Sequence, residues 1–136
     1  MIPDTHNTAR EHIAGIGVDI VSIDRIRRSL QTYGRSFVNR VFTEPEQRYC
    51  GDKAKPAQHY AARFAAKEAA MKVLGTGWGN GIGWPDISVH RSPDAPPELH
   101  ISGQAQDVAE ALGITNFHLS LSHGSDQALA FCLGEK

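Results

Sequence analysis

The chain has 136 residues, a length that suits one domain with one hydrophobic core. Its 40% hydrophobic and 21% charged residues exclude a disordered chain, and no apolar run approaches the roughly 20 residues that span a bilayer. The net charge of −1 conceals an asymmetry, because residues 25–72 hold eleven Lys/Arg and four Asp/Glu, or +7, which leaves −8 elsewhere. This basic segment predicts a surface that attracts an anionic partner, such as nucleic acid, a phosphorylated cofactor or an acidic protein.

The cysteines and the N-terminus indicate the compartment. Cys50 and Cys132 are too few and too scattered for a disulfide framework or a thiolate zinc site. The first twelve residues are polar and lack the apolar core of a signal peptide. We therefore expect a cytoplasmic protein with reduced thiols and no membrane partner.

The first half of the chain predicts one strand followed by helices. The strand is rich in Ile and Val, and Gly15 and Gly17 permit a close backbone approach on one side of it. Ser22 can cap the first helix, Thr43 opens a capping-box pattern, and Pro56 begins a long helix. The predicted elements are a strand over residues 13–21 and helices over residues 23–33, 43–51 and 56–75.

The second half predicts mainly strands. Two alternating segments are joined by a proline-rich turn, and two more by a turn at residues 123–126, so each pair predicts a hairpin. No internal repeat or linker divides the chain, and we expect one α+β domain. The predicted elements are strands over residues 86–91, 98–101, 116–122 and 127–133, with an Ala-rich helix over residues 104–112.

The long helix carries the strongest chemical signal, in Arg63-Phe-Ala-Ala-Lys-Glu-Ala-Ala-Met-Lys72. Glu68 and Lys72 lie one turn apart on the same stripe, with a second set of cations nearby. The helix runs into residues 75–83, where five of nine residues are glycine. A carboxylate, several cations and a glycine-rich turn suggest a metal ion and a phosphate. An ordinary solvated helix with charge pairs would give the same pattern, so this segment alone leaves both interpretations open.

Asp19 is the unusual residue of the first predicted strand. A carboxylate between Val18 and Ile20 is costly to bury unless it is paired or bound to metal, although it would be unremarkable facing water or capping the next helix. If this strand lies against the long helix, Asp19 and Glu68 would supply two oxygen ligands to one hard cation. Mg²⁺ usually takes one or two carboxylates and fills its octahedron with water and phosphate oxygens. The pair therefore predicts a Mg²⁺–phosphate site.

The remaining motifs are less informative. The glycine-rich turn matches neither nucleotide-binding fingerprint, and Trp78 and Trp84 give it flat surfaces for a core or an adenine-like ring. His123 follows a strand at a turn, where the backbone or a phosphate would be its partner. The other histidines have no metal-ligand spacing, and no Gly-x-Ser-x-Gly supports a serine hydrolase.

Three segments together closely resemble the bacterial holo-[acyl-carrier-protein] synthases, the short branch of the 4'-phosphopantetheinyl transferase superfamily. The segments are Gly15–Val21, Arg63–Lys72 with the following Gly75-Thr-Gly77, and Leu119–His123. The resemblance covers about residues 13–133 and implies a 4'-phosphopantetheinyl transferase-like fold over residues 13–136, with a mostly antiparallel sheet packed against a long central helix and shorter helices. Residues 1–12 would form an N-terminal extension.

The resemblance implies a definite reaction. Coenzyme A donates its 4'-phosphopantetheine arm to a serine of apo-acyl carrier protein, with release of adenosine 3',5'-bisphosphate, in fatty acid biosynthesis. Mg²⁺ would grip the coenzyme A pyrophosphate. Either Glu68 or a metal-bound water would accept the serine proton. By the same resemblance, Asp19 and Glu68 bind the metal, Glu68 and Lys72 are catalytic, and Arg63, Lys72, Gly75 and His123 hold coenzyme A.

The resemblance also implies partners. Acyl carrier proteins are similar to small acidic helical bundles, and Arg25 and Arg28 on the first helix would contact them. The family is usually a homotrimer with active sites between subunits. This sequence departs from larger relatives at Val21, where they carry a further acidic residue, so water would replace that ligand. It also has Ala95-Pro96-Pro97 where relatives often have Gly-Lys-Pro.

Two other classes of function stay open on the residues alone. A Mg²⁺-dependent phosphohydrolase acting on a nucleotide would use the same carboxylates and cations, but it would need no acyl carrier protein. A non-catalytic nucleic-acid-binding module would use the +7 segment, although its arginines are not interleaved with stacking aromatics and no nucleic-acid motif is present. We expect no nucleic acid partner.

Overall fold

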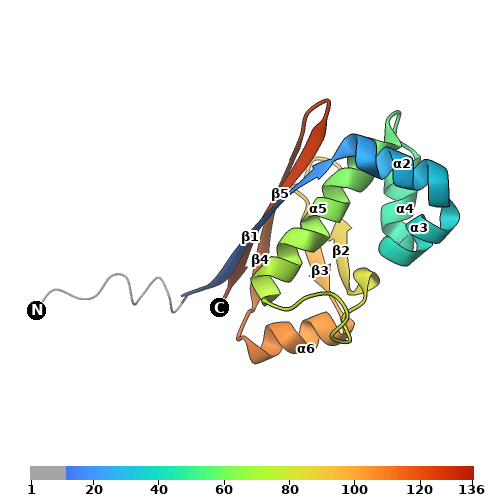
Figure 1. Ribbon diagram of the computed structural model, residues 1–136. Helices are drawn as coiled ribbons and strands as arrows, with labels where there is room; N and C mark the ends of the chain where they lie inside the picture. The colour runs from blue at the N-terminus through green and yellow to red at the C-terminus, as the bar shows by residue number, and fades with distance from the viewer. Residues whose placement is uncertain (1–11) are drawn as a thin grey trace, which may run out of the picture.

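A computed structural model describes residues 12–136 (Figure 1). The expected N-terminal extension therefore lies, up to residue 11, outside the described residues. Within residues 12–136 no helix is long and apolar enough to cross a membrane. The α+β fold expected from the sequence is confirmed, with antiparallel strands around one long helix.

The main sheet has three antiparallel strands in the order β1-β5-β4. They are β1 (Ile13–Ser22), β5 (Gln127–Glu135) and β4 (Asn116–His123), so the hairpin expected near the C-terminus forms as predicted. Figure 1 shows the helices and the smaller sheet gathered on one side of this sheet. The central strand is therefore β5, and β1 and β4 are its two edges.

Helix α5 (Pro56–Leu74) lies across the covered face of the main sheet and forms the centre of the core. It also contacts the first helix and the small sheet, which explains why alanine dominates it and why most of its residues are buried. Gly75 ends it in the left-handed conformation, with φ of 72°.

Three short helices precede α5, namely α2 (Ile23–Tyr33), α3 (Arg35–Val41) and α4 (Glu44–Gly51). The caps predicted for α2 and α4 are present, because the Ser22 hydroxyl accepts from the Arg25 amide and Thr43 forms a capping box with Glu46. The sequence predicts no helix over residues 35–41. Helix α3 has only seven residues and no side-chain N-cap, and its Phe37 and Val38 pack on the core, so tertiary contacts determine it.

The second predicted hairpin forms a separate two-stranded sheet. Strands β2 (Ile87–His90) and β3 (Glu98–Ile101) pair with each other, after the short 3₁₀ turn η1 (Trp84–Asp86). Helix α6 (Gly103–Ala111) then leads to β4. This small sheet packs against α5 and α4 and so helps to bury the helix that carries the candidate site.

Candidate active site

Asp19 on β1, Glu68 on α5 and Lys72 on α5 meet at the β1 edge of the main sheet. The Lys72 ammonium lies 3.5 Å from Asp19 Oδ1 and donates to the Val18 carbonyl at 2.6 Å. The Asp19 carboxylate is close enough to Glu68 to raise the pKa of its carboxyl. We refer to Asp19 and Glu68 as the carboxylate pair.

The glycines of β1 explain why these groups meet. A Cβ built on Gly17 would lie 1.9 Å from the Ala69 carbonyl oxygen, and one on Gly15 would lie 3.0 Å from the Val73 oxygen. The strand therefore runs directly against the helix backbone on this face. Asp19 is on the same face of β1 as Gly17, because side chains alternate along a strand, and it is brought beside the next turn of α5.

Glu68 lies in a half-buried position under an aromatic side chain. The indole Nε1 of Trp78 donates to Glu68 Oε1 at 3.2 Å. Burial raises the pKa of the Glu68 carboxyl, and the neighbouring Asp19 carboxylate raises it further. The Trp78 hydrogen bond and the charges of Lys72 and Arg25 act in the opposite direction and lower this pKa. Burial and the neighbouring carboxylate thus disfavour the ionised form in the absence of a further cation.

The carboxylate pair has the donor chemistry of a Mg²⁺ site. Two carboxylates at a partly exposed edge leave the remaining coordination positions to water and phosphate oxygens, as this ion prefers. Residues 12–136 contain no group of three or more His, Cys, Asp and Glu side chains placed to hold a metal ion. Val21, two residues after Asp19, is buried in the core and supplies no third ligand. The donors present therefore fit Mg²⁺ and do not form an all-protein cage.

A second group, which we call the basic cluster, comprises Lys53, His59, Arg63 and His123. Arg63 is only 2% exposed, its guanidinium lies 4.0 Å over the Tyr49 ring, and it donates to the His59 carbonyl. Its Nε is buried without a hydrogen-bond partner among the described residues. The His59 and His123 rings meet edge to face, with their centroids 5.7 Å apart. The Lys53 ammonium lies 4.3 Å from the centre of the Tyr49 ring. Burial, Arg63 and His123 lower the pKa of His59, so the cluster is a site of accumulated positive potential.

The carboxylate pair and the basic cluster each have one member on an edge strand of the main sheet, while Glu68 and Arg63 both belong to α5. Asp19 is on β1 and His123 is on β4, and β5 separates these strands. The structure thus brings Asp19, Glu68 and Lys72 together, and it brings Arg63 near His123 through His59. Among residues 12–136 no ion pair or hydrogen bond joins the two groups directly.

Helix α2 places Arg25 beside Glu68 of the carboxylate pair. The Arg25 guanidinium lies 5.8 Å from the centre of the Phe64 ring on α5, and its charge acts on Glu68. Arg28 is exposed and pairs with Asp24 at 3.3 Å. With Ser29, Thr32 and Tyr33, the two arginines line a shallow hollow of about 300 Å³ on the helix surface.

Gly75 ends α5, at the position where the sequence predicted that the long helix would stop. Its amide donates to the Met71 and Lys72 carbonyl oxygens and closes α5. The residue is exposed, and a Cβ there would meet no atom within 4 Å. Gly75 therefore offers space and a left-handed turn at this end of the helix, and its N–H is already engaged.

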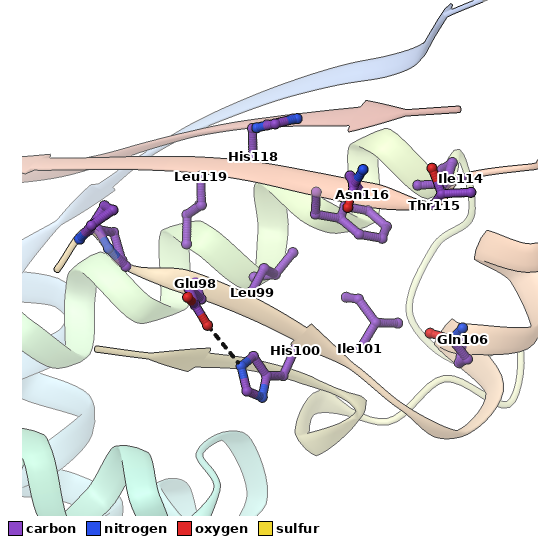
Figure 2. Close-up of a pocket in the computed structure, with 13 residues that line it drawn as sticks. Glu98, Leu99, His100, Ile101, Gln106, Ile114, Thr115, Asn116, His118 and Leu119 are labelled. Carbon is purple, nitrogen blue, oxygen red and sulfur yellow. Dashed lines mark hydrogen bonds and ion pairs between the residues drawn. The ribbon is translucent and has the colours of Figure 1, made fainter. Parts of the chain in front are cut away.

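A groove between β3 and β4 lies apart from both groups (Figure 2). It has a volume of about 640 Å³, with apolar walls that include Leu99, Ile101 and Phe117 and with His100 and His118 among its polar residues. None of the site residues predicted from the sequence lines it. The chemistry-bearing side chains are thus gathered on α5 and the sheet edges, outside this groove.

Sequence reasoning missed several side chains of the two groups. Tyr49, Lys53 and His59 join Arg63 only through packing, although His59 stands one helical turn before Arg63 on the same stripe. Trp78 was noted as a flat surface, but its hydrogen bond to Glu68 depends on the path of the glycine-rich turn. Periodicity contains no signal for that path.

Comparison with known proteins is decisive at the family level. Residues 15–132 match the family model described as "ACPS: 4'-phosphopantetheinyl transferase superfamily". The chain belongs to this superfamily. It is therefore an enzyme, a phosphopantetheinyl transferase, as the resemblance implied.

Curated relatives from this superfamily span nearly the whole chain. The holo-[acyl-carrier-protein] synthase of Koribacter versatilis is 47% identical over 118 residues, which are 87% of this chain and 94% of the relative. That of Syntrophus aciditrophicus is 46% identical over 123 residues, 90% and 96% of the two chains.

Solved structures of the superfamily share the fold. The holo-[acyl-carrier-protein] synthase from Neisseria meningitidis superposes with a TM-score of 0.83 at 36% identity, covering 91% of this chain and 99% of that one. The Helicobacter pylori enzyme, in complex with coenzyme A, gives 0.77 at 31% identity, with 88% and 98% covered. The fold class predicted from the sequence is confirmed by these superpositions.

Proposed function

We propose that the protein transfers the 4'-phosphopantetheine arm of coenzyme A to a serine of an apo-acyl carrier protein in a Mg²⁺-dependent reaction. The names of its relatives, and the complexes of the Helicobacter pylori and Bacillus anthracis enzymes with coenzyme A, support this substrate pair. The observation that carries the proposal is the meeting of Asp19, Glu68 and Lys72 at one sheet edge.

The carboxylate pair would hold Mg²⁺ through one oxygen or more from each of Asp19 and Glu68. When bound, the ion supplies neutralisation of the pyrophosphate charge and polarisation of the attacked phosphorus. Lys72, about half exposed and already oriented by Asp19 and the Val18 carbonyl, would donate to a phosphate oxygen as negative charge develops.

The transfer exchanges one phosphorus–oxygen bond for another. The serine Oγ would attack the β-phosphorus of coenzyme A, and the bond to adenosine 3',5'-bisphosphate would break. Two acceptors are open for the serine proton, namely Glu68 and a water molecule beside it. Glu68 Oε1 is engaged by Trp78, so Oε2 is the atom with capacity for the site.

The basic cluster would bind the phosphates of coenzyme A at the other edge of the sheet. Arg63 and His123 carry this role in the proposal, and Lys53 and His59 add to it. The buried, unpartnered Nε of Arg63 and the four basic side chains around one position fit an anion. Coenzyme A would contact Gly75 by occupying the open space at the end of α5.

The separation of the two groups supports a homotrimer with its active sites between subunits. The carboxylate edge of one subunit would meet the basic edge of the next. The uncovered face of the main sheet provides the contact, because Ile16 and Ile20 on β1 are 55% and 56% exposed and Phe131 on β5 is 39% exposed. Large side chains in a row on one sheet face indicate an interface.

Helix α2 would receive the acyl carrier protein. Arg25 lies beside Glu68, so a partner docked there would present its serine to the carboxylate pair. An acidic partner suits the arginines of this helix, which would steer and orient it. We further propose that the reaction serves fatty acid biosynthesis in the cytoplasm, in keeping with the buried free thiols of Cys50 and Cys132.

The direct test is the intact mass of apo-acyl carrier protein after incubation with the protein, coenzyme A and Mg²⁺. We expect a gain of one phosphopantetheine unit, abolished by EDTA and by Glu68→Gln, which removes a charged ligand at nearly constant volume. Transfer at the wild-type rate by a folded Glu68→Gln protein would overturn the metal assignment. No transfer to several apo-carriers, with release of a phosphate product from coenzyme A instead, would favour the phosphohydrolase.

A further inference from the structure

The Trp78 side chain connects the glycine-rich turn to the carboxylate pair. Its indole N–H donates to Glu68 Oε1 at 3.2 Å, across ten positions of sequence. Gly75 has a φ of 72°, a region that most side chains avoid, and it turns the chain at the end of α5, three residues before Trp78. This turn allows Trp78 to return onto the helix that the chain has just left.

The ring of Trp78 is held by a stack of aromatic side chains. It lies on Trp84 with ring centroids 3.9 Å apart and planes 21° apart. Trp84 in turn stacks on Phe64 of α5 at 5.1 Å and 28°. Trp78 is thus the outer ring of the stack, and its contact with Trp84, which is itself packed on Phe64, limits its sliding and tilting.

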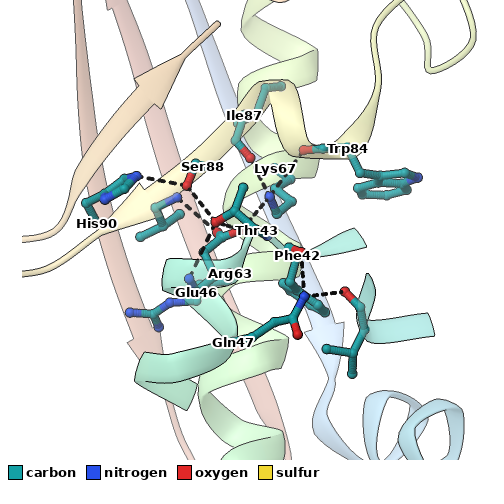
Figure 3. Close-up of polar contacts among 12 residues, drawn as sticks. Phe42, Thr43, Glu46, Gln47, Arg63, Lys67, Trp84, Ile87, Ser88 and His90 are labelled. Carbon is teal, nitrogen blue, oxygen red and sulfur yellow. Dashed lines mark hydrogen bonds and ion pairs between the residues drawn. The ribbon is translucent and has the colours of Figure 1, made fainter. Parts of the chain in front are cut away.

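The stack is anchored to a buried ion pair (Figure 3). Lys67 Nζ donates to the backbone carbonyls of Trp84 and Ile87 and lies 2.8 Å from Glu46 Oε1. Both charged side chains are fully buried. The carbonyl of Trp84 is therefore bound to a group that cannot move without exposing or separating two charges.

We propose that Trp78 is a positioning residue for Glu68, and that it fixes the orientation in which this carboxylate presents Oε2 to a divalent cation. The inference rests on the metal role assigned to Glu68 in the proposed function. A half-buried carboxylate has few solvent partners, so its orientation depends on the donors that the protein supplies. Outer hydrogen-bond partners of metal-binding carboxylates typically set metal affinity by such orientation.

The test replaces the donor and keeps the ring. Trp78→Phe retains a ring to stack on Trp84 and loses the N–H, whereas Trp84→Phe makes the same chemical change one ring further from Glu68. Mn²⁺ binding would be measured from the free-ion electron paramagnetic resonance signal, in the presence of coenzyme A and with a coenzyme A blank. We expect Trp78→Phe to bind Mn²⁺ about 10-fold more weakly. Trp84→Phe should bind Mn²⁺ with close to the wild-type affinity. Thermal unfolding would check that both variants are folded.

A spectroscopic readout adds a second measurement. Trp78 and Trp84 are the only tryptophans of the chain, so all tryptophan emission of the Trp84→Phe protein comes from Trp78. Saturation with Mg²⁺ should change its emission, because the carboxylate that accepts its N–H through Oε1 becomes a metal ligand through Oε2. The same titration of Trp84→Phe combined with Glu68→Gln should leave the emission unchanged.

Four results would overturn the inference. Unchanged Mn²⁺ affinity in Trp78→Phe would remove the positioning role while the proposed function stands. Equal losses in both phenylalanine variants would assign the effect to the stack and not to the hydrogen bond. An unaltered Trp78 emission at saturating Mg²⁺ would count equally against it. A wild-type protein that binds no Mn²⁺ would overturn the metal assignment in the proposed function and this inference with it.

Discussion

Lys67 and Glu46 carry opposite charges that have no contact with water. Glu46 also accepts from the amides of Thr43 and Val89, each at 2.9 Å, and so links the start of α4 to the small sheet. Burial lowers the pKa of Lys67, and the proximity of Glu46 opposes that shift. Each charge is thus tolerated only while its partner is present.

We predict that Lys67→Met lowers the free energy of unfolding by about 3–5 kcal/mol, because it leaves Glu46 charged, buried and short of a partner. Urea unfolding followed by circular dichroism would measure it. Adding Glu46→Gln should recover part of the loss, since an amide oxygen still accepts from Thr43 or Val89 without a charge. A Lys67→Met protein as stable as the wild type would contradict the pairing.

At the scale of elements, the contact of β1 with α5 determines the site. Gly17 permits this contact, and the contact places Asp19, two residues later, beside Lys72 of α5. The same contact leaves the alternate side chains of β1 pointing away from the helix, where they form the uncovered apolar face.

We predict that Gly17→Ala costs about 1–3 kcal/mol or more, because the new Cβ would overlap the Ala69 carbonyl and force the strand from the helix. Gly51→Ala is the matched control: it lies at the end of α4, where a Cβ meets nothing within 4 Å, and should change stability by less than about 1 kcal/mol. Thermal and urea unfolding of both variants would compare them. Equal effects would argue against the close approach.

Helix α2 yields a prediction about partner binding. Arg25→Glu should weaken binding of acyl carrier protein by about 10-fold or more and leave coenzyme A binding within about twofold, because charge reversal beside Glu68 repels an acidic partner. Arg40→Glu on α3 is the control, since it changes the net charge equally at another exposed site. Titration calorimetry with each ligand would measure both. Equal losses for the two ligands in Arg25→Glu would contradict docking on α2.

At the scale of the whole molecule, the proposed trimer would build each site from the carboxylate pair of one chain and the basic cluster of another. Asp19 and His123, one from each group, lie on either side of the central strand β5. A closed ring of identical subunits can join unlike edges, each chain giving one half to each neighbour.

We therefore predict complementation between two impaired variants. Glu68→Gln damages only the carboxylate half and His123→Ala only the basic half, so each alone should be nearly inactive. When the two variants are co-expressed in equal amounts and mix at random, about one site in four receives two intact halves. The mixture should therefore recover about a quarter of the wild-type transfer rate. Light scattering would check that the oligomer is unchanged. No recovery in mixed oligomers would show that one chain builds the whole site.

The local patterns of the chain determined most elements of the fold. Composition, alternation and caps sufficed for β1, the helices α2, α4 and α5, and both hairpins, because these signals depend on neighbours a few residues apart. Helix α3 escaped prediction because seven residues without a side-chain cap are stable only when packed.

The sequence by itself determined the family of the protein and the identities of its candidate site residues, since both are expressed as residue types at short, regular spacing. Only the tertiary structure decided which of those residues meet. Strand order places Asp19 and His123 on opposite edges, the Gly17 contact sets Asp19 beside Glu68, and the return of the glycine-rich turn brings Trp78 to the same carboxylate. These contacts join residues at least ten positions apart, and their geometry follows from how the strands and α5 pack together, which no local period encodes.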